Sequence, residues 1–360
     1  MTNSRLYTGL SQSDITQQIE RLVQFIERHD TPAFRFEVTR SNPERMERTQ
    51  LSRYLKHIRQ MMDLFQEDFP YQYSEHLRAF WEACQDIGLE RSAEGPVCLN
   101  ESATAYLGHH RSMNVLVERI RELTGELWYR RPKGDRRQQA KENAVRVCDY
   151  SDAMISRYSR TLIIRLNLYY YQTVQLRLRV EQVFADLDRL TVEHERNPLF
   201  DHLIGYICAV EQGEGRGYHI HAAYFFNGNE VWADVYKAQQ IGDLWGRITQ
   251  GQGYFDSCNH DKEEKYKGKD GDGDEGQDED EDEDEDKRGL GIGTILRSDQ
   301  DIRRHVHYAI CYLIKDDQHL RMKPFRSKSL RMGLTNNPST TKSIAKADRP
   351  AGNRSKGRSY

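Results

Sequence analysis

The sequence lacks most of the motifs and runs that place a protein in a class at once. No Gly-x-x-x-x-Gly-Lys-Ser/Thr loop occurs, so the chain carries no recognisable ATPase of its own. No run approaches about 18 apolar residues, and the first residues do not resemble a signal peptide. We therefore expect no membrane partner and a cytoplasmic location. The six cysteines are far apart and form no Cys-x-x-Cys pair, which argues against a disulfide framework and favours reduced thiols.

Charge is unevenly distributed along the chain. The segment 261–286 holds sixteen acidic residues and four lysines, a net charge of −12, so the net charge of −3 leaves about +9 for the rest. From Leu320 onward there are eleven Lys or Arg residues and one acid, Asp348. This basic end either contacts nucleic-acid phosphates or is a solvated disordered tail.

The first 150 residues have the hydrophobic spacing of helices. Apolar residues recur at helical intervals through three stretches, and these stripes predict a helical core. A further helix is expected from about Met113 to Tyr129, stopped near Pro132, and a polar helix from about Asp135 to Tyr158. We find no chemistry in this part of the sequence.

From Thr161 the pattern alternates between strands and helices. A β-branched and aromatic strand at 161–171 precedes a helix, and a hairpin follows with arms at 203–211 and 218–226. After another helix, either Gly251–Phe255 or Gly291–Leu296 supplies a fourth strand, before a last helix from about Gln300 to Lys315. The order β-α-β-β-α-β-α predicts an α+β fold with a ferredoxin-like or RRM-like antiparallel sheet.

The chain divides into three parts on this interpretation. We predict a helical region at 1–158, a sheet domain at 159–328 with a disordered acidic insertion at 261–288, and a basic disordered tail at 329–360. The stretch Asp270–Glu275 begins like a calcium loop but has Glu275 where the sharp turn requires glycine. The insertion is a surface loop or a segment that mimics DNA charge.

Two histidines on the second hairpin arm form the first half of a candidate site. His219 and His221 are two residues apart, so their side chains point to the same face of a strand and make a metal half-site. The alternative is a pair of ordinary histidines on the sheet surface. A second pair, His305 and His307, falls in the last helix, where residues two apart diverge and cannot share a metal.

The last helix carries the second half. Tyr308, Tyr312 and Lys315 are spaced to lie on one helix face. A tyrosine hydroxyl with a pKa near 10 needs a nearby cation to act as a nucleophile at neutral pH. A metal, a tyrosine and a lysine together suit the cleavage of a DNA strand through a phosphotyrosine link.

His219, His221 and Tyr312, together with Glu211, Trp245 and the stretch 308–318, resemble the HUH endonucleases, and most closely the replication initiators of filamentous phages and prophages. The resemblance covers about Thr161 to Lys328 and implies an HUH core. It implies a rolling-circle initiator that nicks and rejoins single-stranded origin DNA in a bacterial host cytoplasm, beside a host helicase and polymerase. His219 and His221 would hold one Mg²⁺ or Mn²⁺, Tyr312 would attack, and Lys315 would steady the phosphate unless it is simply solvated.

The resemblance leaves two positions open. Glu211 is the candidate third metal ligand, but Gln212 and Glu214 are nearby, and a one-residue register slip would turn Glu211 to the other face. Tyr308 is either the alternating nucleophile of the two-tyrosine initiators or a core aromatic.

Two other functions compete with the nickase. One is a non-catalytic DNA- or RNA-binding regulator of a prophage, built on the same sheet with a degenerate site. The other is a zinc hydrolase, which would need an open zinc site and an activated water, and no third histidine occurs at a suitable spacing. Basic residues at the end of the chain are expected to contact phosphates, and they are Arg303, Arg304, Arg321, Lys323, Arg326, Lys328 and Arg331.

Overall fold

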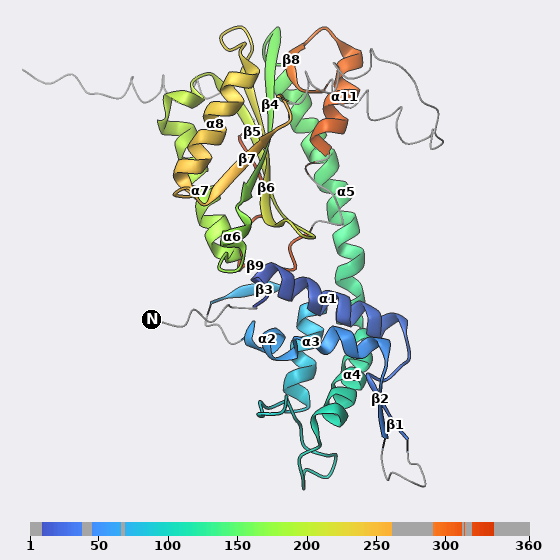
Figure 1. Cartoon of the computed structure of the whole chain (residues 1–360). Coiled ribbons are helices and arrows are strands. Elements are labelled where there is room, and N and C mark those ends of the chain that lie inside the picture. Colours follow the sequence, from blue (N-terminus) through green and yellow to red (C-terminus); the bar gives the residue numbers. More distant parts are fainter. Residues whose placement is uncertain are drawn as a thin grey trace, which may run out of the picture.

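The computed structural model describes residues 9–37, 45–65, 69–260, 291–311, 313 and 319–334. These residues form two lobes joined by one long helix, α5 (Leu127–Ile155), which runs from one lobe to the other (Figure 1). One lobe is mainly helical, and the other is built on a six-stranded antiparallel sheet. The chain is therefore a mixed α+β protein, as predicted. Every helix within the described ranges is too short or too polar to cross a lipid bilayer.

The helical lobe is built from amphipathic helices packed on one another. Helix α1 (Gln12–Arg28) starts at a capping box, in which Ser11 and Asp14 satisfy each other's backbone N–H groups. Its apolar stripe Ile19, Leu22, Val23 and Ile26 is buried. The other elements of this core are η1 (Gln50–Leu55), α2 (Ile58–Asp63), α3 (Glu75–Asp86) and α4 (His109–Gly125).

The prediction of an all-helical N-terminal region is wrong in detail. Strands β1 (Phe34–Glu37) and β2 (Arg45–Arg48) form a hairpin, and β3 (Tyr71–Tyr73) pairs with β9 (Met322–Pro324). These strands have three or four residues, too few to show an alternating pattern. The partner of β3 is some 250 positions away, so no local signal indicates the pairing.

The prediction that a helix ends near Pro132 is also wrong. Helix α4 ends at Gly125, and Glu126 is extended with φ −70° and ψ 150°. Helix α5 then begins at Leu127 and contains Pro132 in its second turn. A proline there removes one backbone hydrogen bond, and the packing of α5 on both lobes outweighs that loss.

The sheet has the order β10-β5-β6-β4-β7, with β8 paired to the other end of β4. Three long strands form its centre, namely β4 (Arg160–Tyr170), β5 (Leu203–Gly213) and β6 (Gly217–Asn227). Both candidate fourth strands are present, as β7 (Gly253–Ser257) and β8 (Gly293–Leu296). Strand β10 (Leu330–Met332) forms the edge beside β5, so the predicted disordered tail begins with a strand.

The two faces of the sheet have separate covers. Helices α7 (Val180–Arg196) and α8 (Asp234–Ile248) pack on the face that carries Leu162, Ile164 and Leu166. Helices α5 and α11 (Gln300–Cys311) pack on the face that carries Ile163, Ala223 and Phe225 (Figure 1). The remaining short helices are α6 (Gln172–Gln175) and η2 (Pro198–Phe200).

Polar contacts hold the two lobes together. The amide of Gln212, at the end of β5, donates to the Ser13 carbonyl at 2.9 Å and to the Thr16 hydroxyl at 2.7 Å. Arg321 pairs with Glu20 of α1 and donates to the Gln212 carbonyl oxygen at 3.2 Å. These groups are buried or nearly so, which makes their loss costly.

All six cysteines have free thiols, as predicted. The Sγ atoms of Cys148 on α5 and Cys311 on α11 lie 3.0 Å apart, where the two helices pack. Burial and the neighbouring Cys311 thiol raise the pKa of Cys148 to about 12. The Cys148 thiol is therefore protonated at neutral pH.

Candidate metal centre

Strand register brings three predicted ligands to one face of the sheet. Glu211 on β5 lies directly opposite His219 on β6, and His221 lies opposite Asn167 on β4. Because side chains alternate along a strand, all four point to the face covered by α5 and α11. The register slip that would have turned Glu211 away does not occur. Gln212 points to the other face and contacts α1.

The three side chains converge tightly. Nε2 of His221 lies 3.1 Å from a Glu211 carboxylate oxygen and 3.2 Å from Nε2 of His219, and the same oxygen is 3.9 Å from His219 Nε2. The exposed fractions of Glu211, His219 and His221 are 5%, 2% and 4%. Glu214, the other nearby acid, instead pairs with Arg21 at the surface.

Hydrogen bonds at the far side of each ring fix the tautomers. Nδ1 of His219 is 3.1 Å from the Gly217 carbonyl oxygen, and Nδ1 of His221 is 2.5 Å from Oδ1 of Asn167. Each acceptor requires the proton to be on Nδ1, which leaves Nε2 with a lone pair. The Asn167 amide nitrogen faces Sγ of Cys258 at 3.9 Å, consistent with this orientation.

The electrostatics also favour a neutral His219 ring. Burial and the adjacent His221 lower the pKa of His219 to about 4. Its imidazole is therefore uncharged at pH 7, which is the form that binds metals.

This donor set fits a divalent cation. Two imidazole lone pairs and a carboxylate oxygen face one point, and no proton lies between the two Nε2 atoms. Ligand atoms on adjacent corners of an octahedron with bonds of about 2.1 Å are about 3 Å apart. The observed 3.1 and 3.2 Å match that spacing, and the 3.9 Å separation needs a small movement of Glu211. Among the described residues, this is the only group of three or more His, Cys, Asp or Glu side chains placed to share a metal ion.

A cavity of about 410 Å³ opens beside Glu211. It lies between β5, α3, α5 and the returning chain, and Leu313 just beyond α11 is part of its wall. Arg78, Arg136 and Lys323 also line it, and burial lowers the pKa of Lys323. Glu75 lines the cavity as well and pairs with Arg136, so the wall beside Glu211 carries charges of both signs.

Helix α11 carries one predicted tyrosine and ends just before the other. Val306, Ala309 and Ile310 bury the inner face of α11 against the sheet. Tyr308 is 44% exposed, so the interpretation of Tyr308 as a core aromatic is wrong, and it does not line the cavity beside Glu211. Tyr312 and Lys315 lie outside the described residues, as does the acidic segment 261–288.

Several basic residues expected to contact phosphates have acidic partners instead. Arg303 pairs with Asp152 at 3.4 Å, Arg321 with Glu20, and Arg331 with Asp188. His307 is 3.0 Å from the same Asp152 carboxyl group. These side chains join elements of the fold.

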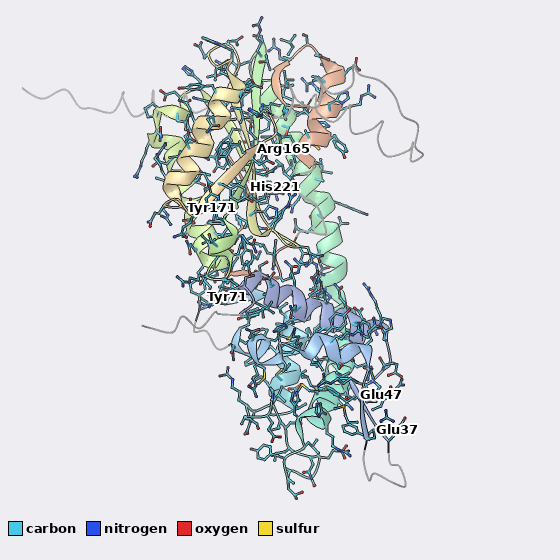
Figure 2. All side chains as sticks on the ribbon, in the orientation of Figure 1. Glu37, Glu47, Tyr71, Arg165, Tyr171 and His221 are labelled. Atoms are coloured by element: carbon cyan, nitrogen blue, oxygen red, sulfur yellow. The ribbon has the colours of Figure 1, made fainter. Side chains whose placement is uncertain are left out.

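A row of tyrosines leads away from the histidines along the same face. The ring centroid of Tyr169 is 5.5 Å from that of His219 and 5.2 Å from that of Tyr254, which stacks in turn on Tyr171 at 5.1 Å. Tyr254 and Tyr171 are 40% and 48% exposed. Arg216 donates to the Tyr169 hydroxyl at 3.1 Å. Figure 2 shows Tyr171 and His221 in the sheet lobe, far from Glu37 and Glu47 on the β1–β2 hairpin.

Sequence reasoning missed Asn167 and the tyrosine row. An asparagine among the apolar and aromatic residues of 161–171 is the signal that could have identified the former. Trp245, by contrast, is fully buried on the opposite face and donates to the Tyr169 carbonyl at 3.1 Å. It packs against β4 on the face opposite the histidines and does not contact the candidate metal ligands.

Comparison of this chain with protein-family models, with curated proteins and with solved structures found no match.

Proposed function

We propose that this protein is a metal-dependent DNA nicking and joining enzyme of the HUH type, which initiates rolling-circle replication through a 5′-phosphotyrosine. The observation that carries the proposal is the convergence of Glu211, His219 and His221 on the sheet face against which α11 packs. Tyr312 follows the end of that helix by one residue. This chemistry requires a tyrosine nucleophile and a cation site, and Tyr312 is the tyrosine that we propose for it.

The topology supports the same proposal. The strand order β5-β6-β4-β7, with α7 and α8 on one face, agrees with the split β-α-β order expected of a ferredoxin-like core. The histidine strand β6 is then central, and the opposite face is left for α5 and α11.

Each residue has a defined part in the reaction. A bound Mg²⁺ or Mn²⁺ would polarise the scissile phosphate and offset the charge that grows on its oxygens. His219, His221 and Glu211 would hold the ion, and Gly217 and Asn167 would orient the imidazoles. The Tyr312 oxygen attacks phosphorus and the bond from phosphorus to the 3′-oxygen breaks. The tyrosine proton ends on the 3′-hydroxyl, and Lys315 steadies the phosphate. Attack by that hydroxyl reverses the step and rejoins the strand.

The products define the test. The 5′-phosphate stays on the protein, so DNA on the 3′ side of the nick becomes attached to it. A pool of random single-stranded oligonucleotides labelled at the 3′ end, mixed with Mn²⁺ and the protein, should give a labelled band that survives denaturation. A 5′ label should not appear on the protein.

Three variants separate the roles. The adduct should disappear in Tyr312→Phe and with EDTA, and fall at least tenfold in His219→Ala. Tyr308→Phe tests whether two tyrosines alternate: unchanged nicking with loss of a second transfer supports alternation, and full activity in both steps shows that Tyr312 acts alone. If no adduct forms with any single-stranded pool, the competing function, a non-catalytic nucleic-acid binder, is favoured.

A further inference from the structure

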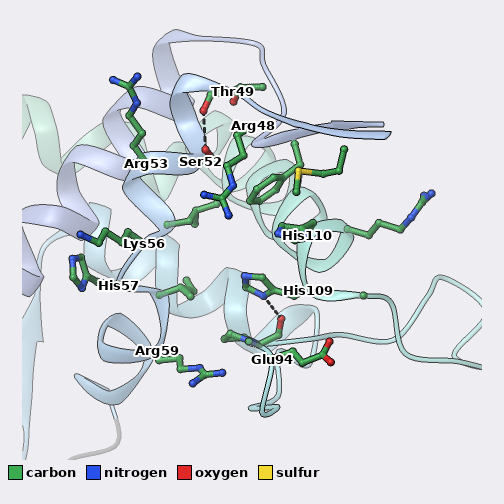
Figure 3. Close-up of a pocket in the computed structure, with 18 of the residues that line it drawn as sticks. Arg48, Thr49, Ser52, Arg53, Lys56, His57, Arg59, Glu94, His109 and His110 are labelled. Atoms are coloured by element: carbon green, nitrogen blue, oxygen red, sulfur yellow. Dashed lines mark hydrogen bonds between the residues drawn. The ribbon is translucent and has the colours of Figure 1, made fainter. Parts of the chain in front are cut away.

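The helical lobe contains a large basic cavity far from the candidate metal centre. Its volume is about 1730 Å³, and it lies between the β1–β2 hairpin, η1, α2 and the start of α4 (Figure 3). Five Arg or Lys residues and three histidines line it, against the single acid Glu94. The basic set is Arg48, Arg53, Lys56, Arg59, Arg111, His57, His109 and His110.

Several of these cations are not used by the fold. Arg48, Arg53 and Lys56 are exposed, and none has an acidic side chain within 4 Å among the described residues. Within the described part of the chain, Arg59 donates to the carbonyls of Ser92 and Ala93. Some other arginines of this lobe have acidic partners, as Arg119 has Asp86 and Glu122. Arg48, Arg53 and Lys56 bring like charges together around one hollow, and an anion bound there would reduce their repulsion.

The backbone adds to the positive potential. Helix α4 begins at this cavity, its N-cap is Gly108, and no acidic residue occupies its first turn. The partial positive charge of the helix terminus is therefore not offset by a side chain. Burial and the neighbouring His109 and Arg48 lower the pKa of His110, in keeping with positive surroundings.

The shape argues for an extended ligand. Cavities for small molecules usually measure about 300–1,000 Å³ and enclose the ligand with apolar walls. This hollow is larger, and its charged groups come from three separate segments of chain. We infer that the cavity lined by Arg48, Arg53 and Lys56 binds the phosphodiester backbone of DNA, as a second nucleic-acid site remote from the metal centre.

The choice of DNA as the polyanion rests on the proposed nicking activity, since an initiator must hold DNA on either side of the nick. Phosphate contacts of this kind position a nucleic acid without reading its sequence. A mixed-sequence oligonucleotide is therefore a sufficient probe, either single-stranded or annealed to its complement.

The experiment compares two triple variants by fluorescence anisotropy in EDTA, where no nicking takes place. One is Arg48→Ser/Arg53→Ser/Lys56→Ser in the cavity. The other, Arg28→Ser/Arg177→Ser/Arg196→Ser, removes the same charge from exposed arginines outside it. At low salt, the cavity variant should bind DNA at least tenfold more weakly than the full-length wild type, and the control should change less than threefold.

The salt dependence gives a second readout. For duplex DNA, the slope of log affinity against log salt should fall by about 0.9 for each phosphate that the variant no longer neutralises, and single strands should show about 0.7. Whichever form of DNA, single-stranded or duplex, shows the larger change in slope is the form that the cavity binds. Equal affinities and slopes for the cavity variant and wild type, with both still folded by circular dichroism, would overturn the inference. The inference would also be overturned if tripolyphosphate bound in the cavity but the three substitutions left the affinity for DNA unchanged.

Failure of this site and failure of the nickase are distinguishable. If the cavity inference is wrong, Tyr312-dependent adducts still form and DNA affinity does not depend on Arg48, Arg53 and Lys56. If the nickase proposal is wrong, the cavity variant still loses DNA affinity although no adduct ever forms.

Discussion

Asn167 on β4 accepts a hydrogen bond from Nδ1 of His221 on β6, and the two residues are direct cross-strand partners. The asparagine does not reach the metal position itself. Its contribution is to hold one imidazole in the tautomer and orientation that a cation needs.

Asn167→Leu should therefore weaken Mn²⁺ binding by about tenfold to a hundredfold. Titration calorimetry with the metal alone measures this without any DNA. Asn167→Asp keeps an acceptor oxygen at the same position and should retain most of the affinity. A leucine variant that binds Mn²⁺ as tightly as the wild type would remove Asn167 from the site.

Gly217 supports the other imidazole and allows a direct comparison with Gly215 in the same turn. Both have positive φ, at 65° and 69°, where an alanine costs about 1–2 kcal/mol. A Cβ on Gly217 would also come within 2.3 Å of Oε1 of Gln175, whereas one on Gly215 would meet nothing within 4 Å. Gly217→Ala should be the more destabilising of the two in urea unfolding, and it alone should weaken Mn²⁺ binding.

The stacked tyrosines beside His219 offer a path for unpaired bases. Base stacking on an aromatic ring is worth about 1–3 kcal/mol per base. Tyr254→Ala should reduce affinity for single-stranded DNA by at least fivefold and leave duplex affinity nearly unchanged. Tyr236→Ala, an exposed tyrosine on α8, is the matched control. Equal losses for single and double strands would contradict a stacking role.

Glu20 makes the contact between the lobes dependent on pH. Burial alone would raise its pKa, but the His319 ring, 3.5 Å from the carboxylate, and the positive charge of Arg321 outweigh this and lower the pKa to about 2. A folded-state pKa below the usual 4.5 stabilises the fold above about pH 4.5, and this stabilisation is lost as the pH falls towards 2. The shift corresponds to about 3 kcal/mol at pH 7.

The difference in unfolding free energy between wild type and Glu20→Gln should therefore be largest at neutral pH and shrink below pH 4.5. Denaturant unfolding at several pH values measures it. Glu230→Gln, on an exposed residue, should show no such trend. A difference that stays constant from pH 7 down to pH 3 would show that the Glu20 charge contributes little.

The sequence indicated the sheet lobe well because its signals are local. Alternation along 161–171 and the glycine-rich turn between two long arms predict β4, β5 and β6, and the two-residue spacing of His219 and His221 follows from strand geometry. The position of Glu211 opposite His219 depends only on a short hairpin. These features could be read without knowledge of distant residues.

The rest depends on long-range contacts. Asn167 becomes part of the site only because β4 lies beside β6, although 54 residues separate Asn167 from His221. The basic cavity combines residues of β2, η1 and α4 that are scattered over some 60 positions. The edge strand β10 has only three residues and pairs with a strand more than 100 positions earlier. None of these arrangements leaves a periodic pattern in the sequence.

Helix α5 gives the molecule a property that neither lobe has alone. At 29 residues it is about 40 Å long, and Tyr129 near its start and Tyr150, Met154 and Ile155 near its end are buried in different cores. Proteolytic cleavage in the middle of α5 would leave each lobe with only the half of the helix that packs on it, and would remove the covalent link between the lobes. A domain boundary at residue 158, as predicted, would separate the sheet from α5, which packs on one of its faces. Neither lobe is therefore complete without α5, which contributes buried side chains to both.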